Sequence, residues 1–175
     1  GGLLVSGAGC IANDIWDRQF DKKVARTKER PLANEKVSLR SAWILLTLFL
    51  FFSLFIVLSI PIDSRSLCLQ LASLALPFIL FYPSAKRWFK YPQLILSICW
   101  GFSVLIPWAA SESSIKGSIT LLFCWLATIF WTFGFDTVYA MADEIDDKLI
   151  GLNSSAISLG KESIKTVSFC YVISC

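Results

Sequence analysis

The sequence contains no histidine, and its only methionine is Met141. Without histidine, this chain cannot form a Ser–His–Asp triad, a His-ligated zinc site or a His-ligated haem. Its six cysteines lie in or beside apolar stretches and form no C-x-x-C pair, so we interpret them as small apolar packing residues. Lys, Arg, Asp and Glu are absent from four long stretches, 41–62, 66–85, 91–111 and 117–135.

These uncharged stretches are each about the ~20 residues that a helix needs to cross roughly 30 Å of hydrocarbon. The composition agrees, because 55% of the residues are hydrophobic and the mean hydropathy is +0.64. A soluble core built from 175 residues is too small to cover four such helices. The sequence therefore predicts an all-α integral membrane protein, a multi-helix transmembrane bundle. We expect crossings at 1–13, 41–62, 66–85, 91–111 and 117–140, and a further helix that begins near 163.

The basic residues separate by side when these crossings are numbered. Fourteen of the sixteen Lys and Arg residues fall in the connections on one side, and only Arg65 and Lys116 fall on the other. Such a bias predicts that the basic side is cytoplasmic. The positive electrostatic field on the basic side is therefore stronger than the net charge of +3 suggests.

Acidic residues form two groups on the same predicted side. Asn13, Asp17 and Asp21 recur every four residues, and so do Asp143 and Asp147. Residues four apart share one face of a helix. Because four crossings separate the groups, and an even number returns the chain to its starting side, we expect both groups to meet at one end of the bundle. Both contain D-x-x-x-D-K, which suggests two related halves.

Carboxylates one turn apart repel each other, and a divalent cation reverses that repulsion. Magnesium prefers carboxylate and amide oxygens and takes phosphate oxygens as further ligands. The adjoining Lys and Arg residues would bind phosphate. Acids for a metal and bases for phosphate, beside an apolar bundle, predict a lipid diphosphate as the ligand. A solvated helix end whose acids pair with nearby bases is the alternative for either group alone.

Three segments carry motifs of one known family. "NDIWDRQFDKKVARTKERPL" (13–32) is similar to the N-D-x-x-D-x-x-x-D and R-T-x-x-R-P-L signature of the UbiA-type membrane aromatic prenyltransferases. "DTVYAMADEIDDKLIGLNSSAISLG" (136–160) resembles its second aspartate motif, and "YPSAKRWFKYPQLILSICWGF" (82–102) resembles the branch that prenylates 4-hydroxybenzoate. One departure is that Leu152, Asn153, Ser154 and Ser155 follow Gly151, where the family usually has Ile or Val, Lys, Ser and Thr.

The resemblance implies a bundle of about nine transmembrane helices around a central cavity. Residues 1–175 would form a single prenyltransferase domain truncated at both ends, from the end of the second helix to the start of the seventh. The site would face the cytoplasm, and the multi-pass protein would lie in a bacterial plasma membrane. Expected partners are a polyprenyl diphosphate, an aromatic acid and the lipid bilayer, with no nucleic acid.

The resemblance also implies roles for particular residues, with Mg²⁺ as the cofactor. Asp17, Asp143 and Asp147 would be catalytic. The magnesium-associated residues would be Asn13, Asp14, Asp17, Asp21, Asp143 and Asp147. The candidates for binding the diphosphate or the aromatic substrate are Arg26, Lys28, Arg30, Lys86, Arg87, Asp136 and Tyr139.

The implied activity is Mg²⁺-dependent transfer of a polyprenyl group to the ring of 4-hydroxybenzoate, in ubiquinone or plastoquinone biosynthesis. Within the family, the acceptor could instead be homogentisate, a naphthoate, a chlorophyllide or a haem. A cation transporter is the alternative from another class, but it would need acids at mid-membrane on broken helices. The acidic groups here are predicted at helix ends beside basic loops.

Overall fold

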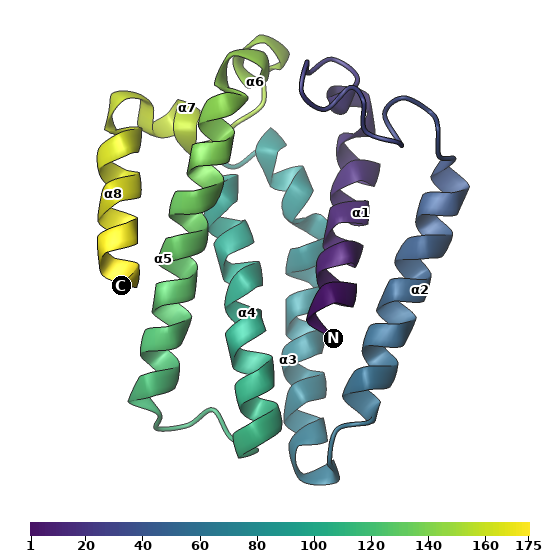
Figure 1. Cartoon of the computed structure of the whole chain (residues 1–175), viewed down its shortest axis with the longest axis vertical. Helices are drawn as coiled ribbons and strands as arrows, with labels where there is room; N and C mark the ends of the chain where they lie inside the picture. Colours follow the sequence, from purple (N-terminus) through teal and green to yellow (C-terminus); the bar gives the residue numbers. More distant parts are fainter.

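The computed structural model describes all 175 residues, and every regular element in it is helical (Figure 1). Five long helices are joined by short connections or by small helical segments. The α-helices are α1 (Gly2–Asp21), α2 (Leu39–Leu58), α3 (Ile62–Phe81), α4 (Pro92–Glu112), α5 (Ile119–Ala142), α6 (Glu144–Ile150), α7 (Ser155–Leu159) and α8 (Ser163–Ser174). Two 3₁₀ segments, η1 (Tyr82–Arg87) and η2 (Gly160–Glu162), complete the chain.

Helices α2, α3, α4 and α5 are long and apolar enough to cross a membrane, which confirms the four predicted spans. Only 35 of the 175 residues are buried, so the bundle exposes much of its apolar surface. Large side chains such as Phe51, Phe55 and Phe123 are at least 60% exposed. A soluble protein would not expose so many aromatic side chains, whereas lipid tails cover them without cost. The chain is an integral membrane protein.

Some helix bounds differ from the prediction. Helix α1 does not end at residue 13 but continues to Asp21, so its acidic residues lie on regular helix. Helix α2 ends at Leu58 and α3 begins at Ile62, directly after Pro61. Proline lacks an N–H and has a fixed φ, which suits the start of a helix and not its interior. Arg65 therefore lies in α3 and donates to the Ile60 carbonyl (3.0 Å) instead of lying in a loop.

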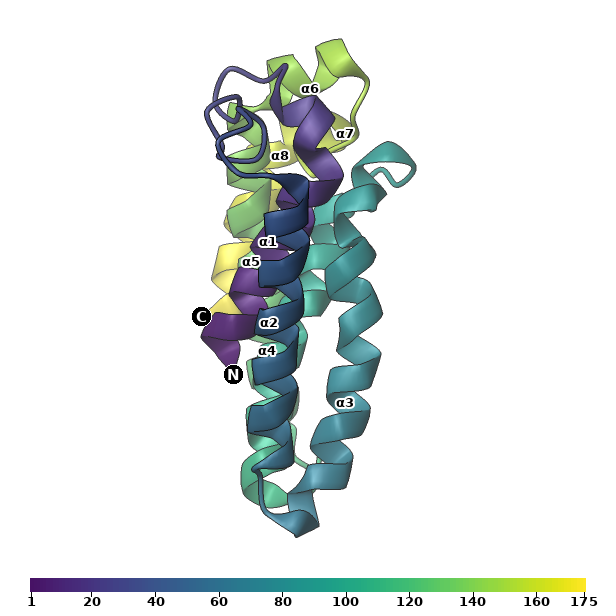
Figure 2. The same ribbon diagram turned by 90° about the vertical axis from the view of Figure 1, so that its right-hand side faces the viewer.

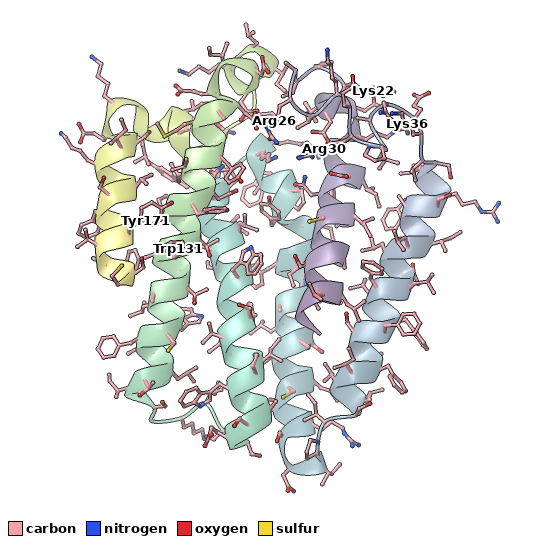
Figure 3. All side chains as sticks on the ribbon, viewed as in Figure 1. Lys22, Arg26, Arg30, Lys36, Trp131 and Tyr171 are labelled. Atoms are coloured by element: carbon pink, nitrogen blue, oxygen red, sulfur yellow. The ribbon has the colours of Figure 1, made fainter.

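The helices form a flattened bundle, which is broad in the view of Figure 1 and narrow in the view of Figure 2. Helix α4 packs between α3 and α5, α8 packs on α5, and α1 packs on α2. Gly101 allows the close approach of α4 and α5, since a Cβ atom there would lie 2.6 Å from the Trp125 Nε1 atom. Between α5 and α8, Trp131 packs against Tyr171 with ring centroids 5.0 Å apart (Figure 3).

The two ends of the bundle differ. The upper end in Figure 1 carries the long 22–38 loop, η1, α6 and α7, whereas the lower end has two short connections, 59–61 and 113–118. At the lower end, the Ser64 hydroxyl donates to the Ala110 carbonyl (3.0 Å) and contacts the Ser113 hydroxyl (2.9 Å). Both termini lie at mid-height. The upper end thus gathers the connections in which the basic residues were expected.

Candidate functional site

The two acidic groups meet at the upper end of the bundle. Arg26, which follows α1, donates from Nε to Asp143 Oδ1 (2.8 Å) and from its terminal nitrogen to Asp143 Oδ2. Figure 3 shows Arg26 and Arg30 between the ends of α1 and α5. The prediction that both groups lie at one end is confirmed.

A small cavity of about 30 Å³ lies between the two groups. Carboxylates from both groups and bases from two connections surround it, and few of its walls are apolar. The residues that line it are Asp17, Phe20, Asp21, Val24, Arg26, Thr27, Arg30, Lys86, Asp143, Asp147 and Leu152. All three residues predicted as catalytic, Asp17, Asp143 and Asp147, are among them.

The first acidic group occupies one face of α1. Asp17 and Asp21 are buried, with 3% and 6% of their surface exposed, because residues four apart point in one direction from a helix. Arg30 bridges this face, since one terminal nitrogen lies 3.0 Å from Asp14 Oδ1 and 3.0 Å from Asp21 Oδ2. The Thr27 hydroxyl donates to the Asp21 carbonyl (3.2 Å) and fixes the first turn of the loop.

Segment η1 supplies the bases for Asp17. Lys86 Nζ lies 2.9 Å from Asp17 Oδ2, and an Arg87 nitrogen lies 3.8 Å from Asp17 Oδ1. Arg87 also donates to the Trp16 carbonyl (2.7 Å) and packs its guanidinium over the rings of Trp16 and Phe20, 5.3 and 5.1 Å from their centroids. A guanidinium over aromatic faces gains cation–π attraction. Arg87 is therefore fixed beside α1 without lining the cavity itself.

The second acidic group is not on one continuous helix, contrary to the spacing argument. Helix α5 ends at Ala142 and α6 begins at Glu144, with Asp143 between them at φ −99° and ψ 2°. The Asp147 N–H still donates to the Asp143 carbonyl (2.9 Å), so both carboxylates remain one turn apart at the cavity. Asp136 is a heptad earlier on α5 and does not line the cavity.

These two carboxylates have different electrostatic environments. The hydrogen bonds from Arg26 lower the pKa of the Asp143 carboxyl below its usual value. Asp147 has no side-chain ion pair, and burial raises the pKa of its carboxyl to about 6, with Lys86 opposing that shift. Desolvation disfavours the charged form of an acid, whereas a hydrogen-bonded cation favours it. Asp147 is thus the carboxylate of the cavity that most lacks a positive partner.

Four predicted substrate-binding residues do not line this cavity, namely Arg87, described above, and Lys28, Tyr139 and Asp136. Lys28 is exposed and makes no side-chain hydrogen bond or ion pair. Tyr139 is 53% exposed on α5 and packs against Phe135, with ring centroids 5.0 Å apart. Asp136 is partly buried on the same helix. Their roles stay predictions.

The donor set suits a hard cation, although the acids are paired with bases in this arrangement. No group of three Asp, Glu or Cys side chains is gathered closely enough to hold a metal ion. The buried Asn13 Oδ1 atom, however, has no hydrogen-bond partner. An amide oxygen left unsatisfied beside several carboxylates is a ligand type that Mg²⁺ uses. These donor types suit magnesium, but bases occupy the carboxylates in this arrangement, and neither Asn13 nor Asp14 lines the cavity.

A set of polar contacts beside the site, buried only at Gln93 and Ser155, was not predicted from the sequence. Asn153 donates to the Lys86 carbonyl from its backbone N–H (2.8 Å) and from its side-chain amide (3.2 Å). The Ser155 N–H donates to Gln93 Oε1 (2.7 Å), and the Ser158 hydroxyl donates to the Lys90 carbonyl (2.7 Å). Asn153, where the family usually has lysine, thus fixes the backbone that carries Lys86.

Two curated relatives match the sequence over more than nine-tenths of this chain. The chain is 46% identical over 161 residues to a 4-hydroxybenzoate solanesyltransferase from Synechocystis, covering 92% of this chain and 53% of that protein. It is 38% identical over 174 residues to a 4-hydroxybenzoate octaprenyltransferase from Thiobacillus denitrificans, covering 98% of this chain and 56% of that protein. The chain therefore spans about half the length of these relatives.

A solved structure has the same fold. The apo structure of a UbiA homolog from Aeropyrum pernix K1 matches with a TM-score of 0.83 and 29% identity, over 98% of this chain and 63% of that one. The UbiA prenyltransferase family matches residues 1–175, the whole chain. Because the match covers the whole chain, the chain belongs to the UbiA prenyltransferase family.

Proposed function

We propose that the protein containing this chain transfers a polyprenyl group from a polyprenyl diphosphate to the ring of 4-hydroxybenzoate, in ubiquinone or plastoquinone biosynthesis. The observation that carries the proposal is that Asp17, Asp143 and Asp147 line one cavity with Arg26, Arg30 and Lys86. Acids for a cation and bases for an anion therefore share one site. The descriptions of the curated relatives support the choice of substrates.

The carboxylates would hold magnesium, together with the unpartnered Asn13 amide oxygen. When bound, the ion would supply charge neutralisation for the leaving diphosphate. Arg26, Arg30 and Lys86 lie where they can turn from the carboxylates to the diphosphate oxygens. A cavity of about 30 Å³ has room for little more than a water molecule, so these ion pairs must open when the substrate binds.

The reaction breaks the bond between the allylic carbon and the diphosphate oxygen, and the electron pair leaves with the diphosphate. The cation-like allylic carbon then bonds to the ring carbon ortho to the phenol, and that ring carbon loses its proton. The bases stabilise the negative charge that develops on the leaving group. Apolar helices keep water away from the allylic cation, which water would convert to an alcohol.

We also propose that the site faces the cytoplasm of a bacterial plasma membrane. The basic connections support this orientation, since Lys and Arg favour the cytoplasmic side. Only Arg65 and Lys116 lie at the opposite end of the bundle from the site.

The test uses the full-length protein in membranes, with 4-hydroxybenzoate and prenyl diphosphates of several lengths, and measures the product by mass spectrometry. We expect Asp17→Asn and Asp143→Asn each to lower turnover by roughly 100-fold or more, the usual effect of removing a group that stabilises developing charge. Asp63→Asn, at the opposite end in the first turn of α3, is the matched control. Unchanged turnover in both site variants would exclude the proposal, and prenylation of a different acceptor in a panel would correct the substrate.

A further inference from the structure

The 22–38 loop is joined to the α5–α6 junction by hydrogen bonds from two consecutive residues. One is the pair that Arg26 forms with Asp143. The other is an exposed backbone-to-side-chain bond, in which the Ala25 N–H donates to Asp146 Oδ2 (3.2 Å). No other hydrogen bond or ion pair joins this loop to residues 143–162.

Under the proposed function, which this inference rests on, the first of these contacts cannot persist during the reaction. Asp143 turns to the cation and Arg26 turns to the diphosphate, so their mutual hydrogen bonds break. Asp146 is not a lining residue of the cavity, and its bond to Ala25 requires neither ligand. The hydrogen bond from the Ala25 N–H to Asp146 is therefore the contact that can persist while Arg26 changes partner.

The neighbouring acid on α6 has a different role. Glu144 forms an ion pair with Lys148 on its own helix (2.6 Å) and does not contact the loop. At its other end, Glu35 of the loop lies 3.7 Å from Arg18 of α1 and 2.6 Å from Lys22, the residue that directly follows that helix. Asp146 therefore provides the fixed point on the side of the second acidic group.

We infer that Asp146 is a positioning residue, which keeps the 22–38 loop docked on α6 and holds the backbone of Arg26 in place while its guanidinium moves from Asp143 to the diphosphate. The carboxylate acts as a hydrogen-bond acceptor for a backbone N–H. An amide oxygen can do the same, so Asp146→Asn keeps the contact and Asp146→Ala removes it.

The first test is limited trypsin digestion of the full-length protein in detergent, with and without Mg²⁺ and inorganic pyrophosphate. Mass spectrometry measures the rate of cleavage after Lys22, Lys23, Arg26 and Lys28. We expect Asp146→Ala to be cleaved roughly fivefold faster than the unmodified protein, the effect of losing one hydrogen bond, most clearly with Mg²⁺ and pyrophosphate. Asp146→Asn and the control Glu144→Gln should be cleaved at the unmodified rate. Equal rates for Asp146→Ala and the unmodified protein would overturn the inference, and so would equally fast cleavage of Asp146→Asn and Asp146→Ala.

The second test is kinetic and distinguishes positioning from a general loss of structure. We expect Asp146→Ala to raise the KM for the prenyl diphosphate by roughly fivefold with little change in kcat, and Asp146→Asn to restore the KM. A fall in kcat at constant KM would contradict the inference. If the unmodified protein forms no prenylated product, the proposed function fails, whereas the digestion rates still decide whether Asp146 holds the loop.

Discussion

The Arg26 guanidinium forms two hydrogen bonds with Asp143, a residue 117 positions later in the chain. Each partner belongs to a different predicted motif, one for phosphate and one for metal. In this contact, the base of the first motif neutralises the acid of the second motif and donates hydrogen bonds to it. A cation and an anion that bind together would separate the pair and replace both halves of it.

Replacing Arg26 should therefore change the binding of the two ligands in opposite directions. In Arg26→Gln, we expect Mg²⁺ alone to bind roughly threefold more tightly, because Asp143 loses its competing cation. Inorganic pyrophosphate in the presence of Mg²⁺ should bind roughly fivefold more weakly, because a charged hydrogen-bond donor is lost. Calorimetric titration of the purified protein measures both affinities. A change of the same sign for both ligands would show that Arg26 does not compete with the cation.

The buried Asp17 carboxylate makes Lys86 important for stability. The Asp17 side chain is 4% exposed, so removing the positive partner leaves a charge in a poorly solvated position. We expect Lys86→Met to lower the free energy of unfolding by about 2–3 kcal/mol, less than for an isolated buried pair because Arg87 remains 3.8 Å away. Denaturation in mixed detergent micelles measures this change.

The double variant Lys86→Met with Asp17→Asn provides the control for this effect. Because it removes the charge together with its partner, it should be less destabilised than Lys86→Met alone. If the two single effects simply add, the ion pair is not the source of the stability.

The stability should depend on pH through Asp147. Burial raises the pKa of this carboxyl to about 6, above the roughly 3.9 expected in the unfolded chain. Between pH 4 and 6 the folded state therefore holds more protons than the unfolded state, and stability falls as the pH rises. Without divalent cations, we expect Asp147→Asn to melt at a higher temperature than the unmodified protein at pH 7, and the difference to vanish near pH 4. A difference that does not change with pH would refute this, with Glu144→Gln as the reference variant.

The contact between α4 and α5 should not tolerate a side chain at residue 101. A Cβ atom there would lie 2.6 Å from the Trp125 Nε1 atom, and the indole is too bulky to move at no cost. We expect Gly101→Ala to be destabilised by about 1–2 kcal/mol, since overpacking outweighs the better helix propensity of alanine. Gly2→Ala, where no atom lies within 4 Å of the added Cβ, is the matched control for thermal unfolding. Equal melting temperatures for the two variants would contradict the prediction.

The sequence predicted the topology of the site because topology depends on counting. Four apolar spans between Asp17 and Asp143 return the chain to the same side, and the Arg26–Asp143 contact confirms this. The four-residue spacing of Asp17 and Asp21 likewise predicted one buried face of α1. The number of spans and the spacing along one helix can both be read from the sequence, and neither depends on how the helices pack.

The pairing of particular bases with particular acids could not be predicted in the same way. Arg26, Lys28 and Arg30 are close in sequence, yet Arg30 bridges two carboxylates of α1 and Lys28 contacts none. The path of the 22–38 loop decides this, and no periodicity encodes that path. The break at Asp143 was also missed, because the backbone turns there while the bond from the Asp147 N–H keeps the helical spacing.

The placement of polar contacts has a mechanical consequence. Serine hydroxyls join α3 to α4 at the lower end, and the Trp16 indole N–H donates to the Leu80 carbonyl (2.8 Å) near the upper end. The Trp16 bond is the only side-chain hydrogen bond that ties α1 to α3. On the rest of their contact these two helices are held by packing alone, so separating them at mid-depth breaks no further side-chain hydrogen bond.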